Sequence, residues 1–173
     1  MKKNIRFIVY AGLIAAIYVV LTYLQNFILP DSATWSVQCR FSEALCVLAF
    51  FTPAAVPGLA IGCLLFNVSY AGALPLDWVV GTLATLLSCW AMWKTRKIRR
   101  PIGKAIIPLL GLAMPALSNA FLVGWELTIY IGGAFWLNAI LVSAGELIVL
   151  YTAGLVLYMA ITSRGLDTRL FGQ

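Results

Sequence analysis

Apolar residues along this chain occur in six long runs, and the segments between the runs are short, polar, basic or rich in proline. A helix needs about 20 apolar residues to cross the ~30 Å hydrocarbon core of a bilayer, so such runs predict membrane-spanning helices. The expected spans cover about residues 7–24, 41–52, 56–71, 76–93, 105–124 and 134–161. The pattern predicts an all-α membrane protein in which residues 1–173 form a single transmembrane domain of six helices.

The first two runs depart from an ordinary membrane span. Pro53 and Pro57 separate the second run from the third and leave the second run short. The first run follows three basic residues, as the apolar part of a secretory signal does, but its polar tail has no small-x-small cleavage pattern. We therefore expect the first run to be a retained membrane helix.

The basic residues are concentrated in three segments, residues 1–6, the loop 94–104 and the tail after residue 161. These segments hold eleven of the twelve Lys and Arg residues, and only Arg40 lies elsewhere. Cytoplasmic segments accumulate Lys and Arg, and six spans place all three segments on the same side of the membrane. The pattern predicts that both termini are cytoplasmic. This bias explains the net charge of +6, so no nucleic-acid partner is expected.

Composition narrows the range of functions. Hydrophobic residues make up 62% of the chain and charged residues only 10%, which excludes a soluble enzyme. The chain has no histidine, and its cysteines at positions 39, 46, 63 and 89 form no C-x-x-C pair. The side chains for a zinc site or for His-dependent catalysis are therefore missing. We expect no metal, no cofactor and no catalytic residue, and we interpret the cysteines as small packing residues.

Ionisable and amide side chains within the runs gather toward the outer ends of the predicted spans. The predicted substrate-binding residues are Arg40, Glu43, Asn67, Asp77, Asn119, Glu126 and Glu146. Glu146 lies about twelve residues into the sixth run, close to the membrane midplane. A carboxylate that faces lipid at this depth would cost several kcal/mol, so Glu146 is expected to face the bundle interior. The distribution predicts a polar pocket that opens to the exterior.

Each of these residues also has a structural interpretation, and the sequence leaves both open. Asp77 could cap the fourth helix, and Glu126, placed just past the outer end of the fifth span, could be merely interfacial. The two asparagines could join neighbouring helices by hydrogen bonds. The arginine could pair with the glutamate that follows it by three positions.

Small residues recur four positions apart in two of the runs. The first run contains Ala11-x-x-x-Ala15, and the third contains Gly58-x-x-x-Gly62. Small side chains allow two helix backbones to approach closely, so both spacings predict close helix contacts.

Two sequence blocks carry a resemblance to a known family. The stretch Val37–Leu45 (VQCRFSEAL), followed by Phe50–Leu59 and Ile61–Cys63, resembles the QueT family of membrane proteins. Asp77 and the stretch Gly81–Thr85 fit the same pattern, and the resemblance covers the whole length. Proteins of this family are similar to the substrate-binding S components of energy-coupling factor (ECF) transporters. The resemblance implies a six-helix, S-component-like bundle in a bacterial plasma membrane that captures a vitamin or cofactor precursor at its outer face.

The same resemblance implies partners. These are an EcfT-like transmembrane coupling protein and two cytoplasmic ECF ATPases. In S components an alanine-x-x-x-alanine motif of the first helix packs on the coupling protein, which makes Ala11 and Ala15 the expected partner contacts. The chain contains no Walker-type phosphate loop. ATP hydrolysis is thus expected only in the partners, and this chain is expected not to be an enzyme.

Two substrates carry equal weight. The family name implies queuosine precursors, which are 7-deazaguanines, and Glu43 could accept hydrogen bonds from their guanine-like N–H edge. The outer face has an excess of acids, which would suit a cationic aminomethyl group; it holds Asp31, Glu43, Asp77 and Glu126 against Arg40. The rival is a corrinoid such as cobalamin, bound in a wider outer cavity with the loop 25–40 as a lid.

Other classes of function remain as alternatives. A stand-alone secondary transporter of a small polar metabolite would be expected to show internal repeats, and none is visible. An intramembrane enzyme could use Glu146 or Cys46 but would lack a partnered base. A purely structural membrane subunit is also possible. Co-purification with ATPases distinguishes the S component from all three.

Overall fold

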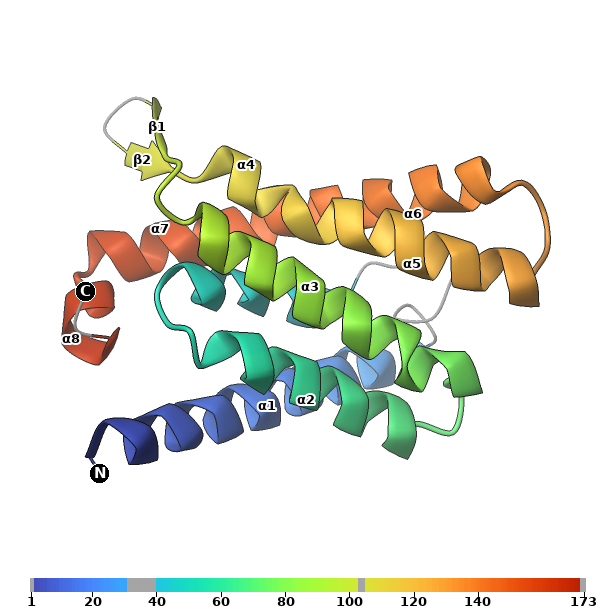
Figure 1. Ribbon diagram of the computed structural model, residues 1–173, viewed down its shortest axis with the longest axis horizontal. Coiled ribbons are helices and arrows are strands. Elements are labelled where there is room, and N and C mark those ends of the chain that lie inside the picture. The colour runs from blue at the N-terminus through green and yellow to red at the C-terminus, as the bar shows by residue number, and fades with distance from the viewer. Residues whose placement is uncertain (1, 31–39, 103–104, 172–173) are drawn as a thin grey trace.

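The computed structural model describes residues 2–30, 40–102 and 105–171 as a helical bundle with one short β-hairpin (Figure 1). In chain order the elements are α1 (Lys2–Ile28), the 3₁₀ helix η1 (Phe41–Phe50), α2 (Ala55–Ser69), the 3₁₀ turn η2 (Pro75–Trp78), α3 (Val80–Thr95), β1 (Arg100–Ile102), β2 (Ala105–Ile107), α4 (Leu109–Leu112), α5 (Met114–Tyr130), α6 (Phe135–Val149), the π-helical segment η3 (Leu150–Gly154), α7 (Leu155–Ser163) and α8 (Leu166–Phe171). The segments long and apolar enough to cross a membrane are Lys3–Ile28, Pro75–Thr95, Leu109–Tyr130 and Phe135–Ser163. The helices η1 and α2 are apolar but shorter.

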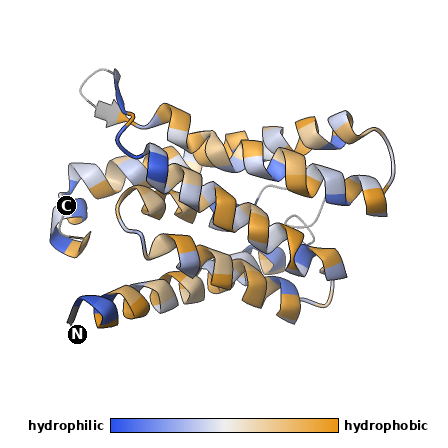
Figure 2. Cartoon of the chain, viewed as in Figure 1, coloured by the Kyte–Doolittle hydropathy of each residue, from blue (hydrophilic) through white to orange (hydrophobic). Residues whose placement is uncertain are grey.

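The helices pack in a simple order around a central element. Helix α1 packs on α2, α2 on α3, α3 on α5, and α5 on α6. The 3₁₀ helix η1 contacts α1, α2, α3, α6 and α7, so it lies in the interior of the bundle. Many large apolar side chains of the helices are exposed, and the helix ribbons are coloured largely as hydrophobic residues (Figure 2). An apolar exterior of this kind is typical of helices that face lipid.

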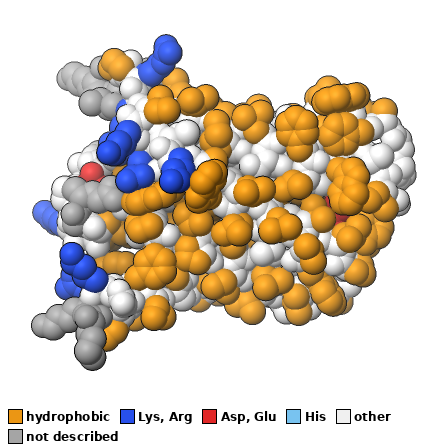
Figure 3. Space-filling view, viewed as in Figure 1, with side chains coloured by type: hydrophobic (Ala, Val, Ile, Leu, Met, Phe, Trp, Pro, Cys, Tyr) orange, Lys and Arg blue, Asp and Glu red, His pale blue; other side chains and the backbone are white. Residues whose placement is uncertain are grey.

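The two ends of the bundle differ in charge. Both termini and the β1–β2 hairpin lie at one end (Figure 1). Figure 3 shows Lys and Arg side chains gathered at this same end, which we call the basic end. The opposite end, here the far end, carries the α2–η2 connection and the α5–α6 turn. In that turn Gly132 and Gly133 have φ angles of 81° and 83°, which glycine adopts without steric cost.

The central helix η1 is unusual in being a ten-residue 3₁₀ helix. A 3₁₀ helix rises about 2.0 Å per residue, so ten residues reach about 20 Å where an α-helix would reach about 15 Å. This geometry explains how the short second run extends far into the bundle. Its buried side chains are Ser42, Glu43, Ala44, Cys46, Val47, Ala49 and Phe50. Long 3₁₀ segments are uncommon.

Helices α1 and α2 approach each other closely at their small residues. A Cβ atom added to Gly58 would lie 2.7 Å from the carbonyl oxygen of Ala11. A Cβ atom added to Gly62 would lie 3.0 Å from the carbonyl oxygen of Ala15 and 2.8 Å from the Cβ atom of Tyr18. The two small-residue spacings therefore meet each other, and the close contacts that they predict are confirmed.

The fifth apolar run differs most from its predicted bounds of 105–124. Residues 105–107 form β2 and pair with β1, and the helical segment extends from Leu109 to Tyr130. Pro108 has no N–H to donate, and the helix begins directly after it. At its other end the helix continues past Glu126 to Tyr130, and the Glu126 side chain is buried. Glu126 thus lies inside α5, about one turn before its end, instead of past the end of the span.

Candidate functional site

The seven predicted site residues lie in the interior. Each is between 1% and 7% exposed, and together they are called the polar cluster: Arg40, Glu43, Asn67, Asp77, Asn119, Glu126 and Glu146. The guanidinium of Arg40 interacts electrostatically with all four carboxylates of the cluster. Residues from η1, α2, η2, α5 and α6 are therefore brought together around one cation.

Glu43 is held by two donors from the protein. It lies on the first turn of η1, whose start is fixed by the backbone N–H of Phe41 donating to Oε1 of Gln25 at 2.7 Å. The hydroxyl of Tyr18 donates to Oε1 of Glu43 at 2.8 Å, and the thiol of Cys46 lies 3.1 Å from its Oε2. Both carboxylate oxygens of Glu43 thus have a protein donor.

Glu146 is held on one side only. It lies on α6, and Nδ2 of Asn119 on α5 donates to its Oε1 at 2.7 Å. This bond joins two neighbouring helices, which realises the structural role considered for Asn119. The other oxygen, Oε2, is buried and has no hydrogen-bond partner among the described residues.

Asp77 and Asn67 fix the connection between α2 and α3. The carboxylate of Asp77 accepts the backbone N–H of Leu74 at 2.8 Å and so caps η2, as its capping interpretation predicts. Nδ2 of Asn67 donates to the backbone carbonyl of Asp77 at 2.8 Å. Oδ1 of Asn67 is buried without a donor among the described residues. Both residues have structural bonds, and Asn67 keeps one free acceptor.

Glu126 differs from the other carboxylates of the cluster. Both of its oxygens are buried, and neither has a donor among the described residues. The carboxyl group of Asp77 lies within hydrogen-bonding range of Glu126. Two ionised carboxylates have no donor to share. Glu126 is thus the side chain with the largest unmet capacity for accepting hydrogen bonds.

These bonding patterns indicate the chemistry that the cluster could bind. It contains four buried acceptor atoms that have no donor within residues 2–30, 40–102 and 105–171: Glu126 Oε1, Glu126 Oε2, Glu146 Oε2 and Asn67 Oδ1. Buried polar atoms are nearly always hydrogen-bonded, and a buried charge is costly unless it is paired. Four carboxyl groups interact electrostatically with a single guanidinium. The arrangement therefore suits a ligand rich in hydrogen-bond donors and poor in negative charge.

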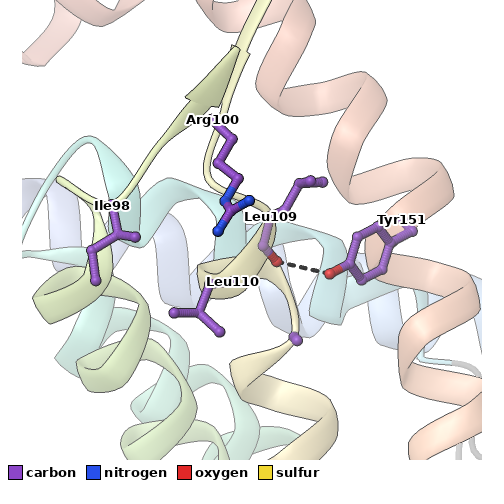
Figure 4. A pocket seen from close by; sticks show the side chains of 6 residues that line it. Ile98, Arg100, Leu109, Leu110 and Tyr151 are labelled. Atoms are coloured by element: carbon purple, nitrogen blue, oxygen red, sulfur yellow. Dashed lines mark hydrogen bonds between the residues drawn. The ribbon is translucent and has the colours of Figure 1, made fainter. Parts of the chain in front are cut away.

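A separate cavity of about 410 Å³ lies at the basic end, beside the β1–β2 hairpin (Figure 4). Arg100 extends from β1 toward Leu109 and Leu110, and Tyr151 lies on the other side (Figure 4). The hydroxyl of Tyr151 donates to the backbone carbonyl of Leu109 at 2.7 Å. The remaining lining is apolar, with Ile98 and Ala113. This cavity contains none of the seven predicted site residues.

Two residues that support the site were not predicted as part of it. Tyr18 is fully buried and bonds Glu43, and Cys63 lies 3.5 Å from Nδ2 of Asn67. A helical spacing of three to four residues places Tyr18 on the same face of α1 as Ala11 and Ala15, and this spacing could have identified it. Cys46, Cys63 and Cys89 are buried, as packing residues should be. Cys39, Asp31 and most of the proposed lid lie outside the described residues.

The predicted partner contacts, Ala11 and Ala15, face the protein's own interior. They are 8% and 4% exposed and pack against α2. A partner could reach them only if α1 and α2 separated. The exposed small residues of α1 are Gly12 and Ala16, one position further along, and a Cβ atom at Gly12 would meet nothing within 4 Å.

Comparison with known protein families gives one match. Residues 8–163 match the QueT transporter family. The chain belongs to this family. QueT membership identifies it as a membrane transporter, which is consistent with a protein that is not an enzyme, and it implies transport of a queuosine precursor. Searches of curated proteins and of solved structures return no significant match.

Proposed function

We propose that this QueT protein is the substrate-capture S component of an ECF-type importer and that it binds a 7-deazaguanine precursor of queuosine. In this arrangement η1 and α2 join the four longer helical segments as the six membrane helices. The basic end faces the cytoplasm, because Lys and Arg accumulate there. The polar cluster then lies toward the outer half of the membrane and can receive a ligand from outside.

The observation that carries this proposal is the pair of unpartnered oxygens of Glu126. A guanine-like ring presents two N–H donors side by side, and the two oxygens of one carboxylate can accept both. Glu126 offers two buried oxygens that no described residue bonds, whereas both oxygens of Glu43 already have donors from Tyr18 and Cys46. We therefore assign the ring edge to Glu126 rather than to Glu43.

Deep burial of the cluster favours the smaller of the two substrates considered. All seven side chains are at most 7% exposed. A deazaguanine is a small, flat ring system, whereas a corrinoid is far larger and would need the helices around η1 to move apart. The peripheral amides of a corrinoid would also bring acceptors as well as donors toward carboxylates that can only accept.

Calorimetric titration of the purified chain tests the proposal. The probes are 7-aminomethyl-7-deazaguanine and, separately, cobalamin. We expect binding of the deazaguanine and a loss of about 10- to 100-fold in the variant Glu126→Gln, since a charge-assisted hydrogen bond contributes about 1.5–3 kcal/mol. Asp167→Asn, in α8 at the basic end, is the matched control and should bind as the unchanged protein does. Binding of cobalamin alone would overturn the proposed substrate.

The partner assignment is tested separately. An S component depends on ATPases for uphill uptake, so the chain should co-purify with a coupling protein and two ATPases when all four are co-expressed. Substrate uptake into vesicles that contain this chain alone, without ATPases, would instead support a secondary transporter.

A further inference from the structure

We propose that Glu146 is the site for a positively charged amine on the ligand, and that the polar cluster thereby selects an aminomethyl-bearing deazaguanine over its neutral 7-cyano analogue. This inference rests on the proposed function, because it takes a 7-deazaguanine as the ligand. It assigns separate roles to two carboxylates, with Glu126 binding the ring edge and Glu146 binding the substituent.

The charge of the polar cluster is the first argument. Glu43, Asp77, Glu126 and Glu146 face the single cation Arg40. Acidic side chains in the cluster therefore outnumber basic ones by four to one. A buried carboxylate is costly as an ion unless a cation pairs with it. A neutral ring satisfies hydrogen bonds but leaves the charge excess unchanged, whereas an ammonium group reduces it.

Geometry at Glu146 is the second argument. Oε1 of Glu146 is occupied by Asn119, but Oε2 is buried and has no donor among the described residues. One free oxygen suits a compact ammonium group, which is a point charge, better than it suits two parallel donors. Glu43 lies close enough to interact electrostatically with Glu146, which adds a second negative charge beside this oxygen.

The positions of the two carboxylates are the third argument. Glu126 lies about one turn from the end of α5 and interacts with Asp77, whereas Glu146 lies in the last turn of α6 and interacts with Glu43. Arg40 interacts with both glutamates. The unpartnered oxygens are thus divided between two poles of one cluster. A ligand with a donor edge at one end and a cation at the other matches this division.

The experiment measures the affinity of the full chain in detergent for 7-aminomethyl-7-deazaguanine and for 7-cyano-7-deazaguanine. These probes differ in the charge of one substituent, so the ratio of their affinities reports on charge selection. We expect the unchanged protein to bind the aminomethyl compound at least about tenfold more tightly. Glu146→Gln should weaken the aminomethyl compound by about 10- to 100-fold and the cyano compound by less than about threefold.

Glu126→Gln is the matched control, because it removes the same charge from the same cluster at the other pole. It should weaken both compounds through the shared ring edge and change the ratio of their affinities less than Glu146→Gln does. Thermal unfolding without ligand verifies that both variants fold. The inference is overturned if the unchanged protein binds the two compounds equally, or if Glu146→Gln weakens both alike. If the protein binds neither compound, the proposed function itself is refuted. This result differs from equal binding of both compounds, which refutes only the selection by charge.

Discussion

The close contact between α1 and α2 makes Gly62 a sensitive position for stability. The change Gly62→Ala adds a Cβ atom that would lie 2.8 Å from the Cβ of Tyr18 and 3.0 Å from the carbonyl oxygen of Ala15. Neither atom is the far end of a flexible side chain. The two helices must therefore move apart by a few tenths of an ångström or more, and the hydrogen bond from Tyr18 to Glu43 moves with them.

The magnitude follows from two opposing effects. Replacing glycine by alanine within a helix stabilises the helix by about 1 kcal/mol. Overpacking of a well-packed contact costs about 1–3 kcal/mol. Because the contact involves backbone as well as side chain, we expect the upper part of this range, and the variant should lose about 1–2 kcal/mol of unfolding free energy.

Gly12→Ala is the matched control for this prediction. Gly12 also lies within a helix, but a Cβ atom there would meet nothing within 4 Å. Only the gain in helix stability applies, so this variant should be as stable as the unchanged protein or more stable by up to about 1 kcal/mol. Unfolding in increasing denaturing detergent, followed by tryptophan fluorescence, compares the two. If Gly62→Ala proves as stable as Gly12→Ala, the close approach of α1 and α2 is not as described.

Four further substitutions probe other parts of the structure. Tyr18→Phe leaves Oε1 of the buried Glu43 without its 2.8 Å donor and should lower the unfolding free energy by about 1–3 kcal/mol; an unchanged denaturation midpoint would contradict this. Tyr151→Phe removes the hydrogen bond to the α4 backbone and should lower the unfolding free energy by about 0.5–1.5 kcal/mol in the same assay. It should not alter the affinity for the deazaguanine, because the cavity beside Tyr151 is separate from the polar cluster. Ala16→Trp should weaken co-purification with the coupling protein while ligand binding persists. Ala15→Trp should impair both co-purification and ligand binding, because it forces α1 away from α2. If instead Ala15→Trp affects only co-purification and Ala16→Trp affects both, this assignment of the two faces is wrong.

The sequence predicted the helical segments because long apolar runs and clustered basic residues are strong signals. The bounds of the fifth segment were wrong because Ala105–Ile107 is apolar in composition yet forms a strand, and because the acidic Glu126 was expected at a helix end. Hydropathy averages residue types and does not report which side chains point inward.

The polar cluster was predictable because ionisable residues in apolar runs must avoid lipid. Its hydrogen bonds were not predictable, because they depend on how separate helices face each other. The sequence suggested Glu43 for the ligand edge. In the structure Tyr18 and Cys46 already bond Glu43, whereas Glu126 has no hydrogen-bond donor in the described part of the chain. Tyr18 is 25 positions before Glu43, and no local pattern links the two.

The central position of η1 has a consequence for biosynthesis. Residues 41–50 emerge early from the ribosome, but among the elements that pack on them are α6, η3 and α7, near the other end of the chain. Until those segments are inserted, the Glu43 carboxylate lacks part of its enclosure and the nascent chain has a polar group within an unfinished bundle. Native packing of the second apolar run therefore has to be completed after the sixth apolar run has been synthesised. Truncation within the last helical segment should thus leave even the early part of the chain incompletely folded.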